Sequence, residues 1–169
     1  VITSLMSMVD LWKNLVQKFF KPSLEKSGSF WRQDRLSFWA QELRKGEVVV
    51  APAESVYGYC CDPFNESALR KLIGIKNRPV DKGMIILVGS TKQLYRFVEK
   101  SELSQAHRDA MKKYWPGPYT LVLPAKNELP DLITGSRNTV AIRMPRPVYM
   151  REYLRVWTKG LVSSSLNET

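Results

Sequence analysis

The stretch Val48–Gly83, VVVAPAESVYGYCCDPFNESALRKLIGIKNRPVDKG, contains a strand pattern, a helix pattern and a cluster of positive charge in close succession. Residues 47–51 are mostly apolar and β-branched, which predicts a strand. From Pro52 the pattern becomes polar and aromatic, and we interpret this part as a loop. Asn65 is the predicted N-cap of a helix over residues 66–76. A strand that leads into a loop, followed by positive charge, suits a phosphate-bearing ligand.

Lys76, Arg78 and Lys82 form the cluster of positive charge, in a loop that Pro79 stiffens. Several cations held in place can neutralise a triphosphate. The same composition also fits an ordinary solvated turn, and spacing alone leaves both interpretations open. The chain contains neither G-x-x-x-x-G-K-[ST] nor G-x-G-x-x-G, so no established phosphate-loop signature decides between them.

Strand and helix patterns alternate through the rest of the chain, which predicts an α/β fold around one largely buried sheet. A helix connection is missing between the last two long strand patterns, so we expect a mixed sheet. The order of the strands does not follow from the sequence. In order, the predicted elements are a helix from Asp34 to Gly46, a strand at 84–88, a helix after Ser90, a helix at 104–114, strands at 119–123 and 139–144, a helix at 148–157 and a strand from Leu161.

Residues 1–30 are predicted to form a separate part of the chain, ahead of a domain over residues 31–169. Apolar residues between Ile2 and Phe20 recur at helical spacing, which indicates an amphipathic helix. Such a helix packs on its own domain, on a partner or on a membrane surface, and the pattern leaves these open. Lys21–Ser29, KPSLEKSGS, has the composition of a linker.

The overall composition favours a polyanionic partner and a reduced compartment. The formal net charge of the 169 residues is +10, which suits nucleic acid, nucleotides or an acidic surface. The two cysteines, Cys60 and Cys61, are adjacent, so an ordinary disulfide between them is sterically improbable. No apolar run approaches the roughly 20 residues that span a bilayer. We therefore expect a cytoplasmic protein without a membrane span.

A second candidate site follows Leu161, where Ser163, Ser164, Ser165 and Asn167 come at the end of a strand pattern. Hydroxyl and amide groups at the carboxyl end of a strand can bind phosphate or carboxylate oxygens. An ordinary capping turn is the alternative. The only histidine, His107, falls in a helix pattern and is interpreted as an exposed residue rather than a base. No cluster of His and Cys predicts a metal site.

Five motifs in this order resemble the YrdC/TsaC family of threonylcarbamoyl-adenylate synthases: PAESVYGYCCDP, K-x-R-P-V-D-K-G, WPGPYT, VAIRMP and SSSLN. The resemblance covers roughly residues 31–169. It implies a single YrdC-like domain, a twisted sheet flanked by helices, with a basic concave face. It also implies a nucleotidyltransferase that uses ATP, L-threonine and bicarbonate, and that releases pyrophosphate as it forms threonylcarbamoyl-AMP. A separate transferase complex would then pass the threonylcarbamoyl group to tRNA, giving threonylcarbamoyladenosine (t6A).

The resemblance also implies roles for single residues. The catalytic Lys-x-Arg and Ser-x-Asn groups fall on Lys76, Arg78, Ser165 and Asn167, and Ser163 joins them in binding the ATP phosphates. The same cavity would bind threonine through Tyr57, Lys82, Thr120 and Arg143. Magnesium would come with the triphosphate, without a dedicated protein metal site or a prosthetic group.

Two departures from the family pattern keep other functions open. Ala53 stands where the family usually has threonine, and the chain stops at Thr169, directly after the Ser-Leu-Asn motif, which predicts a missing terminal helix. One alternative is a non-catalytic module that binds tRNA or double-stranded RNA. Another is a paralogue that adenylates a different carbamate.

Overall fold

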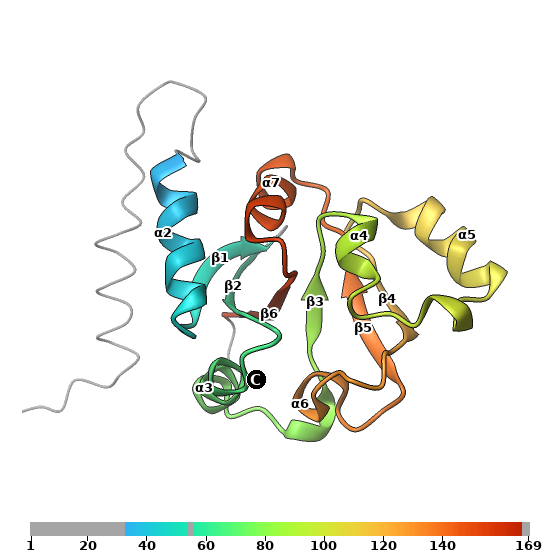
Figure 1. Ribbon diagram of the computed structural model, residues 1–169, viewed down its shortest axis with the longest axis horizontal. Coiled ribbons are helices and arrows are strands. Elements are labelled where there is room, and N and C mark those ends of the chain that lie inside the picture. The colour runs from blue at the N-terminus through green and yellow to red at the C-terminus, as the bar shows by residue number, and fades with distance from the viewer. Residues whose placement is uncertain (1–32, 54–55, 167–169) are drawn as a thin grey trace, which may run out of the picture. The chain divides into compact units, whose positions relative to one another are not determined.

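The structure, a computed structural model, describes residues 33–53 and 56–166 (Figure 1). All of these residues lie in one compact unit, Trp31–Thr169. The predictions for the amphipathic helix, its linker and Asn167 fall on residues outside the described ranges. The division into residues 1–30 and 31–169 stays a prediction.

The predicted mixed sheet is confirmed. Within the described residues the sheet has six strands, in the order β1-β2-β6-β3-β5-β4. Only β3 and β5 pair in parallel, and the other neighbours pair antiparallel. The strands are β1 (Val49–Ala53), β2 (Val56–Cys61), β3 (Ile85–Leu87), β4 (Thr120–Pro124), β5 (Thr139–Arg143) and β6 (Leu161–Ser165).

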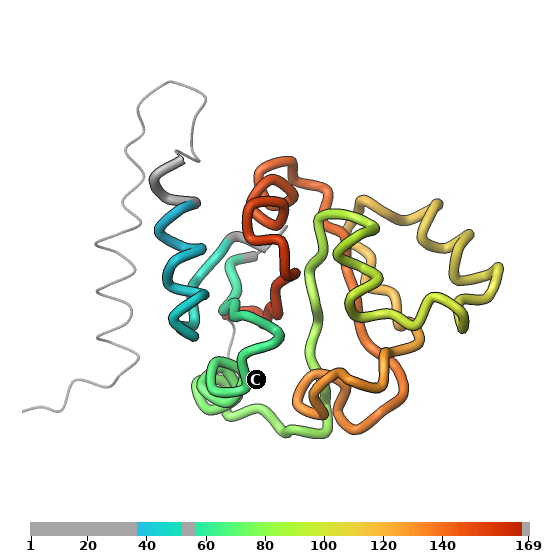
Figure 2. Tube along the Cα trace, viewed as in Figure 1, coloured from blue at the N-terminus to red at the C-terminus, as the bar shows by residue number. Residues whose placement is uncertain are grey.

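Helices cover both faces of this sheet (Figures 1 and 2). One face, which we call the α7 face, packs Val49, Cys60 and Leu161 against α2 and α7. The other, the α3 face, packs Cys61, Ile86, Ile142 and Val162 against α3 and the segments around α4 and α6. The helices are α2 (Gln33–Arg44), α3 (Glu66–Lys76), α4 (Thr91–Leu94), α5 (Gln105–Tyr114), α6 (Asp131–Thr134) and α7 (Val148–Trp157), with short 3-10 turns at Val80–Lys82 and Lys100–Glu102.

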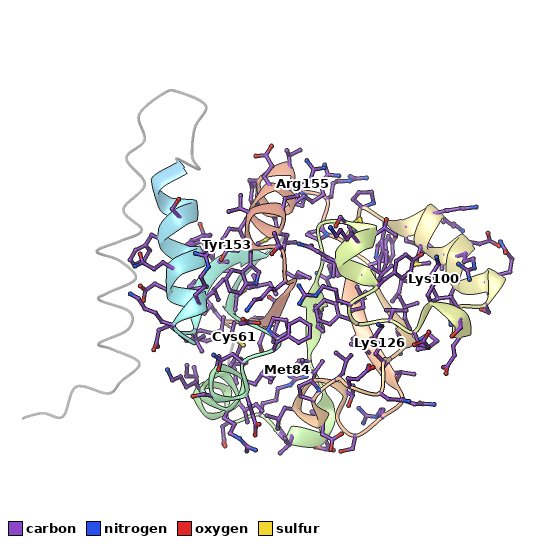
Figure 3. The ribbon with its side chains drawn as sticks, in the orientation of Figure 1. Cys61, Met84, Lys100, Lys126, Tyr153 and Arg155 are labelled. Carbon is purple, nitrogen blue, oxygen red and sulfur yellow. The ribbon has the colours of Figure 1, made fainter. Side chains whose placement is uncertain are left out.

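Aromatic packing joins the two helices of the α7 face. The rings of Trp39 on α2 and Tyr153 on α7 meet edge to face, with centroids 5.1 Å apart. Figure 3 labels Tyr153, which belongs to the core of the α7 face, and Cys61 and Met84, which belong to the core of the α3 face. None of the described helices is long and apolar enough to cross a bilayer.

The α7 face is covered over only part of its width. One row of paired residues runs across the sheet from Val49 through Cys60, Ser163, Ile85 and Ala141 to Val122. The exposed fraction is 7% at Val49, 0% at Cys60 and 61% at Val122, and the residues between Cys60 and Val122 are half-buried. We call the uncovered part, Thr120, Val122, Ala141 and Arg143, the open half of the α7 face. Ligands can approach the sheet there.

The prediction of a loop directly after Ala51 is wrong. β1 continues through Pro52, and Val56–Cys61 forms β2, which pairs with β1 and with β6. Valine and aromatic residues in β2 favour a pleated, half-buried strand. A proline is tolerated in β1 because it is an edge strand, where one row of N–H groups has no partner strand to bond.

The start of one helix and the end of another also differ from the sequence prediction. Asp34 lies within α2, whose described residues begin at Gln33, and not at an N-cap. α4 ends at Leu94, so Phe97 and Val98 follow the helix. Both are nevertheless fully buried against the α3 face, because burial of an apolar side chain does not require a helix.

The predicted caps Asn65 and Ser90 are confirmed. Asn65 Oδ1 accepts a hydrogen bond of 3.0 Å from the Ala68 N–H at the start of α3. His107 belongs to a capping box at the start of α5, where its Nδ1 accepts from the Ser104 N–H at 3.1 Å. The lone histidine therefore has a structural role as a helix cap.

Candidate functional site

The basic loop and the serine-rich end of β6 lie at the same end of the sheet. Ile85 of β3 pairs with Ser163 of β6, and the two strands are antiparallel. Residues that precede Ile85 therefore lie beside residues that follow Ser163. In Figure 1 the connection from α3 to β3 passes below the lower end of β3. The fold thus brings together two segments that are almost ninety residues apart in sequence.

Lys76 is held in place by α3. It is the last residue of that helix and is only 7% exposed. It continues the buried stripe of Ala68, Leu69 and Leu72, so its stem packs among apolar side chains. A cation in the last turn also interacts favourably with the helix dipole. A buried lysine of this kind provides a charge whose position changes little when a ligand binds.

Arg78 closes the loop that follows. Its Nε donates a hydrogen bond of 3.0 Å to the Gly83 carbonyl, and the Met84 N–H donates to the Ile133 carbonyl at 2.8 Å. Lys82 ends the 3-10 turn and is exposed. Hydrogen bonds within the loop and to α6 therefore hold the basic loop in place, and Lys82 is its cation in solvent.

Gly135, directly after α6, is required by this support. Its φ is +64°, and a Cβ there would lie 2.4 Å from the Asp81 carbonyl oxygen. We expect Gly135→Ala to lower the free energy of unfolding by about 1–3 kcal/mol, because backbone atoms must shift and the residue is strained. Thermal denaturation would show this as a Tm lowered by several degrees.

Gly74→Ala is the matched control for that substitution. Gly74 lies within α3, and no atom lies within 4 Å of a Cβ added there. Alanine in a helix interior stabilises it by about 0.5–1 kcal/mol relative to glycine. The two variants should therefore shift Tm in opposite directions, and a rise in Tm with Gly135→Ala would contradict the support described for the loop.

Ser163 and Ser165 point to the α7 face, and Ser164 between them points to the α3 face, as the alternation of the strand requires. Ser163 is half-buried and Ser165 is exposed. Gly58 of β2 makes room for them: a Cβ there would lie 3.0 Å from Ser163 Oγ and 2.9 Å from the Ser164 carbonyl oxygen. Sequence reasoning did not single out Gly58, although a glycine inside a strand pattern is a signal of close approach.

Thr120 and Arg143 form a pair on the open half of the α7 face. They lie opposite each other on β4 and β5, and Arg143 Nε donates a hydrogen bond of 3.0 Å to Thr120 Oγ1. That bond orients the planar guanidinium, whose fork suits a carboxylate. From strand spacing and rise, the Cα atoms of Arg143 and Ser163 are about 12 Å apart. One face thus presents an arginine and a serine row at a separation that one extended ligand can span.

Tyr57 lies elsewhere on the sheet. Tyr57 and Tyr59 are two residues apart on β2, so their side chains point to the same face of the sheet. Tyr59 packs against the core of the α3 face, and Tyr57 therefore belongs to that face and not to the open half. Its carbonyl accepts from the Leu166 N–H at 3.1 Å, which extends the pairing of β2 and β6. The contact with threonine that the resemblance implies for Tyr57 stays a prediction, as do the ligand contacts of the other site residues.

The structure is an α/β domain with cations at one end of a half-covered sheet and with serines and an oriented arginine on its α7 face, groups of the kind that bind anions. The chain matches the family model Sua5/YciO/YrdC, described as "Telomere recombination", over residues 41–169. It therefore belongs to the Sua5/YciO/YrdC family, as the motifs predicted.

Curated relatives carry the name threonylcarbamoyl-AMP synthase. One from Vibrio campbellii is 36% identical over 127 residues, which is 75% of this chain and 69% of the relative. One from Klebsiella pneumoniae is 39% identical over 127 residues, which is 75% of this chain and 67% of the relative.

Solved structures agree on the fold. P. abyssi Sua5 complexed with L-threonine is 32% identical, with a TM-score of 0.74 over 80% of this chain and 39% of that chain. E. coli YciO is 24% identical, with a TM-score of 0.70 over 80% of this chain and 65% of that chain, and shows the fold alone. The chain thus spans about two fifths of the solved Sua5 protein.

Proposed function

We propose that this chain is a threonylcarbamoyl-AMP synthase, which makes threonylcarbamoyl-AMP and pyrophosphate from L-threonine, bicarbonate and ATP. The observation that carries the proposal is that the basic loop and the serine end of β6 lie at the same end of the sheet. Ser163, Ser165 and the Arg143–Thr120 pair point to the α7 face of that sheet. The name shared by the curated relatives supports it.

The reaction requires a carbamate and one phosphoryl substitution. The threonine amine adds to bicarbonate with loss of water, and a carbamate oxygen then attacks the α-phosphorus of ATP. The bond from that phosphorus to the bridging oxygen breaks, and pyrophosphate leaves with both bonding electrons. Negative charge builds on the phosphate oxygens as this occurs, so groups that are already positioned around them lower the barrier.

The residues divide this work by their place in the fold. Lys76 and Arg78 supply positive charge at the phosphates, and Ser163 and Ser165 donate hydrogen bonds to phosphate oxygens; Asn167 would do so as well. Arg143, oriented by Thr120, binds the threonine carboxylate. Lys82, exposed at the end of the 3-10 turn in the basic loop, adds positive charge there. Magnesium would arrive on the triphosphate and be held by phosphate and water.

Pyrophosphate release tests this proposal directly. Release from ATP should require both L-threonine and bicarbonate, and omission of either should reduce it to the background of ATP hydrolysis. Lys112→Ala, which removes an exposed cation on α5, is the control for the loss of one positive charge and should release pyrophosphate as the wild type does. Release that is independent of threonine would refute the proposal. A requirement for another amino acid would favour the paralogue that adenylates a different carbamate.

We further propose that the product passes to a separate transferase complex that modifies tRNA, which places the protein with tRNA in the cytoplasm. The net charge of +10 favours contact with a polyanion during that transfer. Affinity for tRNA should fall steeply as salt rises. Tight tRNA binding without any pyrophosphate release would instead support the non-catalytic RNA-binding module.

A further inference from the structure

The adjacent cysteines of β2 point to opposite faces of the sheet. Cys60 lies in the core of the α7 face and Cys61 in the core of the α3 face, and both are fully buried. Neither has a disulfide partner. The proposed mechanism uses neither thiol, although Cys60 is the register partner of Ser163 in the pairing of β2 with β6.

Cys60 contacts the hydroxyl of Ser163. Its Sγ lies 3.7 Å from Ser163 Oγ and 3.6 Å from the Gly58 carbonyl oxygen. Burial raises the pKa of the Cys60 thiol to about 12, so at neutral pH the group is an uncharged S–H with one proton to donate. When Ser163 Oγ accepts that proton, its own O–H is left to donate in another direction.

The surroundings of Ser163 limit that direction. On the side of β2 the hydroxyl lies over Gly58, where an added Cβ would come within 3.0 Å of it. Cys60 lies under α2 and α7 and is closed to solvent, whereas Ser163, Ile85 and Ala141 are half-buried. Along the row from Ser163 toward β5 and β4, the side chains stay half-buried as far as Ala141, and Val122 on β4 is exposed. A hydroxyl that accepts from Cys60 therefore has its donor side toward the open half of the α7 face.

We propose that Cys60 is a positioning residue: its buried thiol donates to Ser163 Oγ and thereby directs the Ser163 hydroxyl as a hydrogen-bond donor to a phosphate oxygen of ATP. This inference rests on the proposed function, because it takes ATP as the ligand of Ser163. Cys60 itself does not touch the substrate. Loss of the thiol leaves Ser163 present but free to rotate and to donate elsewhere, so ATP should bind more weakly.

Direct measurement of the dissociation constant of ATP, by calorimetry or equilibrium dialysis, tests the inference. Cys60→Ala should weaken ATP binding about 3- to 10-fold, the range expected for one hydrogen bond. Cys60→Ser, which keeps a donor at the same position, should restore binding to within about twofold of the wild type. Cys61→Ala removes an equally buried thiol from the other face, and should lower Tm without changing ATP affinity.

A double-mutant cycle separates positioning from general destabilisation. If Cys60 acts through Ser163, adding Cys60→Ala to Ser163→Ala should not weaken ATP binding further, whereas its effect on Tm should persist. The inference would be overturned if Cys60→Ala weakened ATP binding equally in the wild-type and Ser163→Ala backgrounds. It would also be overturned if Cys60→Ala and Cys61→Ala weakened ATP binding equally. Both outcomes require that the wild-type protein binds ATP. If the cycle shows that Cys60 acts through Ser163 but pyrophosphate release does not depend on threonine, only the proposed function is overturned. If the wild-type protein does not bind ATP, both proposals are overturned.

Discussion

Arg143→Ala is expected to raise the KM for L-threonine about 100-fold and to leave the KM for ATP within about twofold, because charge-assisted hydrogen bonds to a carboxylate contribute about 1.5–3 kcal/mol. The 3.0 Å hydrogen bond to Thr120 fixes the orientation of the guanidinium. We therefore expect Arg143 to bind one ligand group, the threonine carboxylate. Steady-state pyrophosphate release at saturating ATP, with threonine varied, measures the effect.

Two further substitutions sharpen that expectation. Arg143→Lys should recover only part of the affinity, because lysine lacks the planar fork that binds both carboxylate oxygens. Arg137→Ala removes an exposed arginine two residues before β5 and should leave both KM values unchanged. An equal rise in the KM for ATP with Arg143→Ala would place the guanidinium at the phosphates instead of at threonine.

Lys76→Met is expected to lower kcat for pyrophosphate release by about 100- to 1000-fold, the usual loss when one group that stabilises transition-state charge is removed. Methionine keeps an unbranched stem of similar length for the buried position, where the lysine is only 7% exposed. The protein should therefore stay folded, and Tm should not fall by more than a few degrees. Rapid-quench or steady-state release assays at saturating substrates give kcat, and thermal denaturation gives Tm.

Lys71→Met is the control on the same helix. Lys71 is exposed and pairs with Glu47 at 2.9 Å, and exposed ion pairs contribute about 0–1 kcal/mol. This variant should keep both kcat and Tm close to the wild type. If Lys76→Met retained kcat within about threefold, the charge of Lys76 would not stabilise the transition state, and the residue would have a structural role in α3.

Elements with strong local signals followed from the sequence. α3 begins and ends where Asn65 and the 66–76 pattern predicted, and α7 spans the predicted residues 148–157. These signals are local because a cap and a helical stripe involve neighbours within one or two turns. The fold class and the family also followed, because five motifs occur in register along one chain.

The pairing of distant segments did not follow from the sequence. The local sequence pattern predicts a loop where β2 forms, because β2 is stabilised by pairing with β1 and with β6, which lies about a hundred residues later. The same long-range pairing decides which side chains share a face. It separates Tyr57 from Arg143, although the motifs grouped them, and it brings Cys60 to Ser163, a contact that no local pattern in β2 indicates. Thr120 and Arg143 were both predicted for one ligand, and the structure does bring them together.

The row from Val49 to Val122 has a consequence for the strength of charge interactions. Across that row the surroundings change from dry core under α2 and α7 to open surface on β4. The effective dielectric constant rises in the same direction, because more water surrounds the side chains. A hydrogen bond to a charged oxygen is therefore strongest near Cys60 and weakest near Val122. Ser163 lies between the two ends of this row, so the phosphate contact proposed for it would form beside the dry core and still be open to an arriving nucleotide.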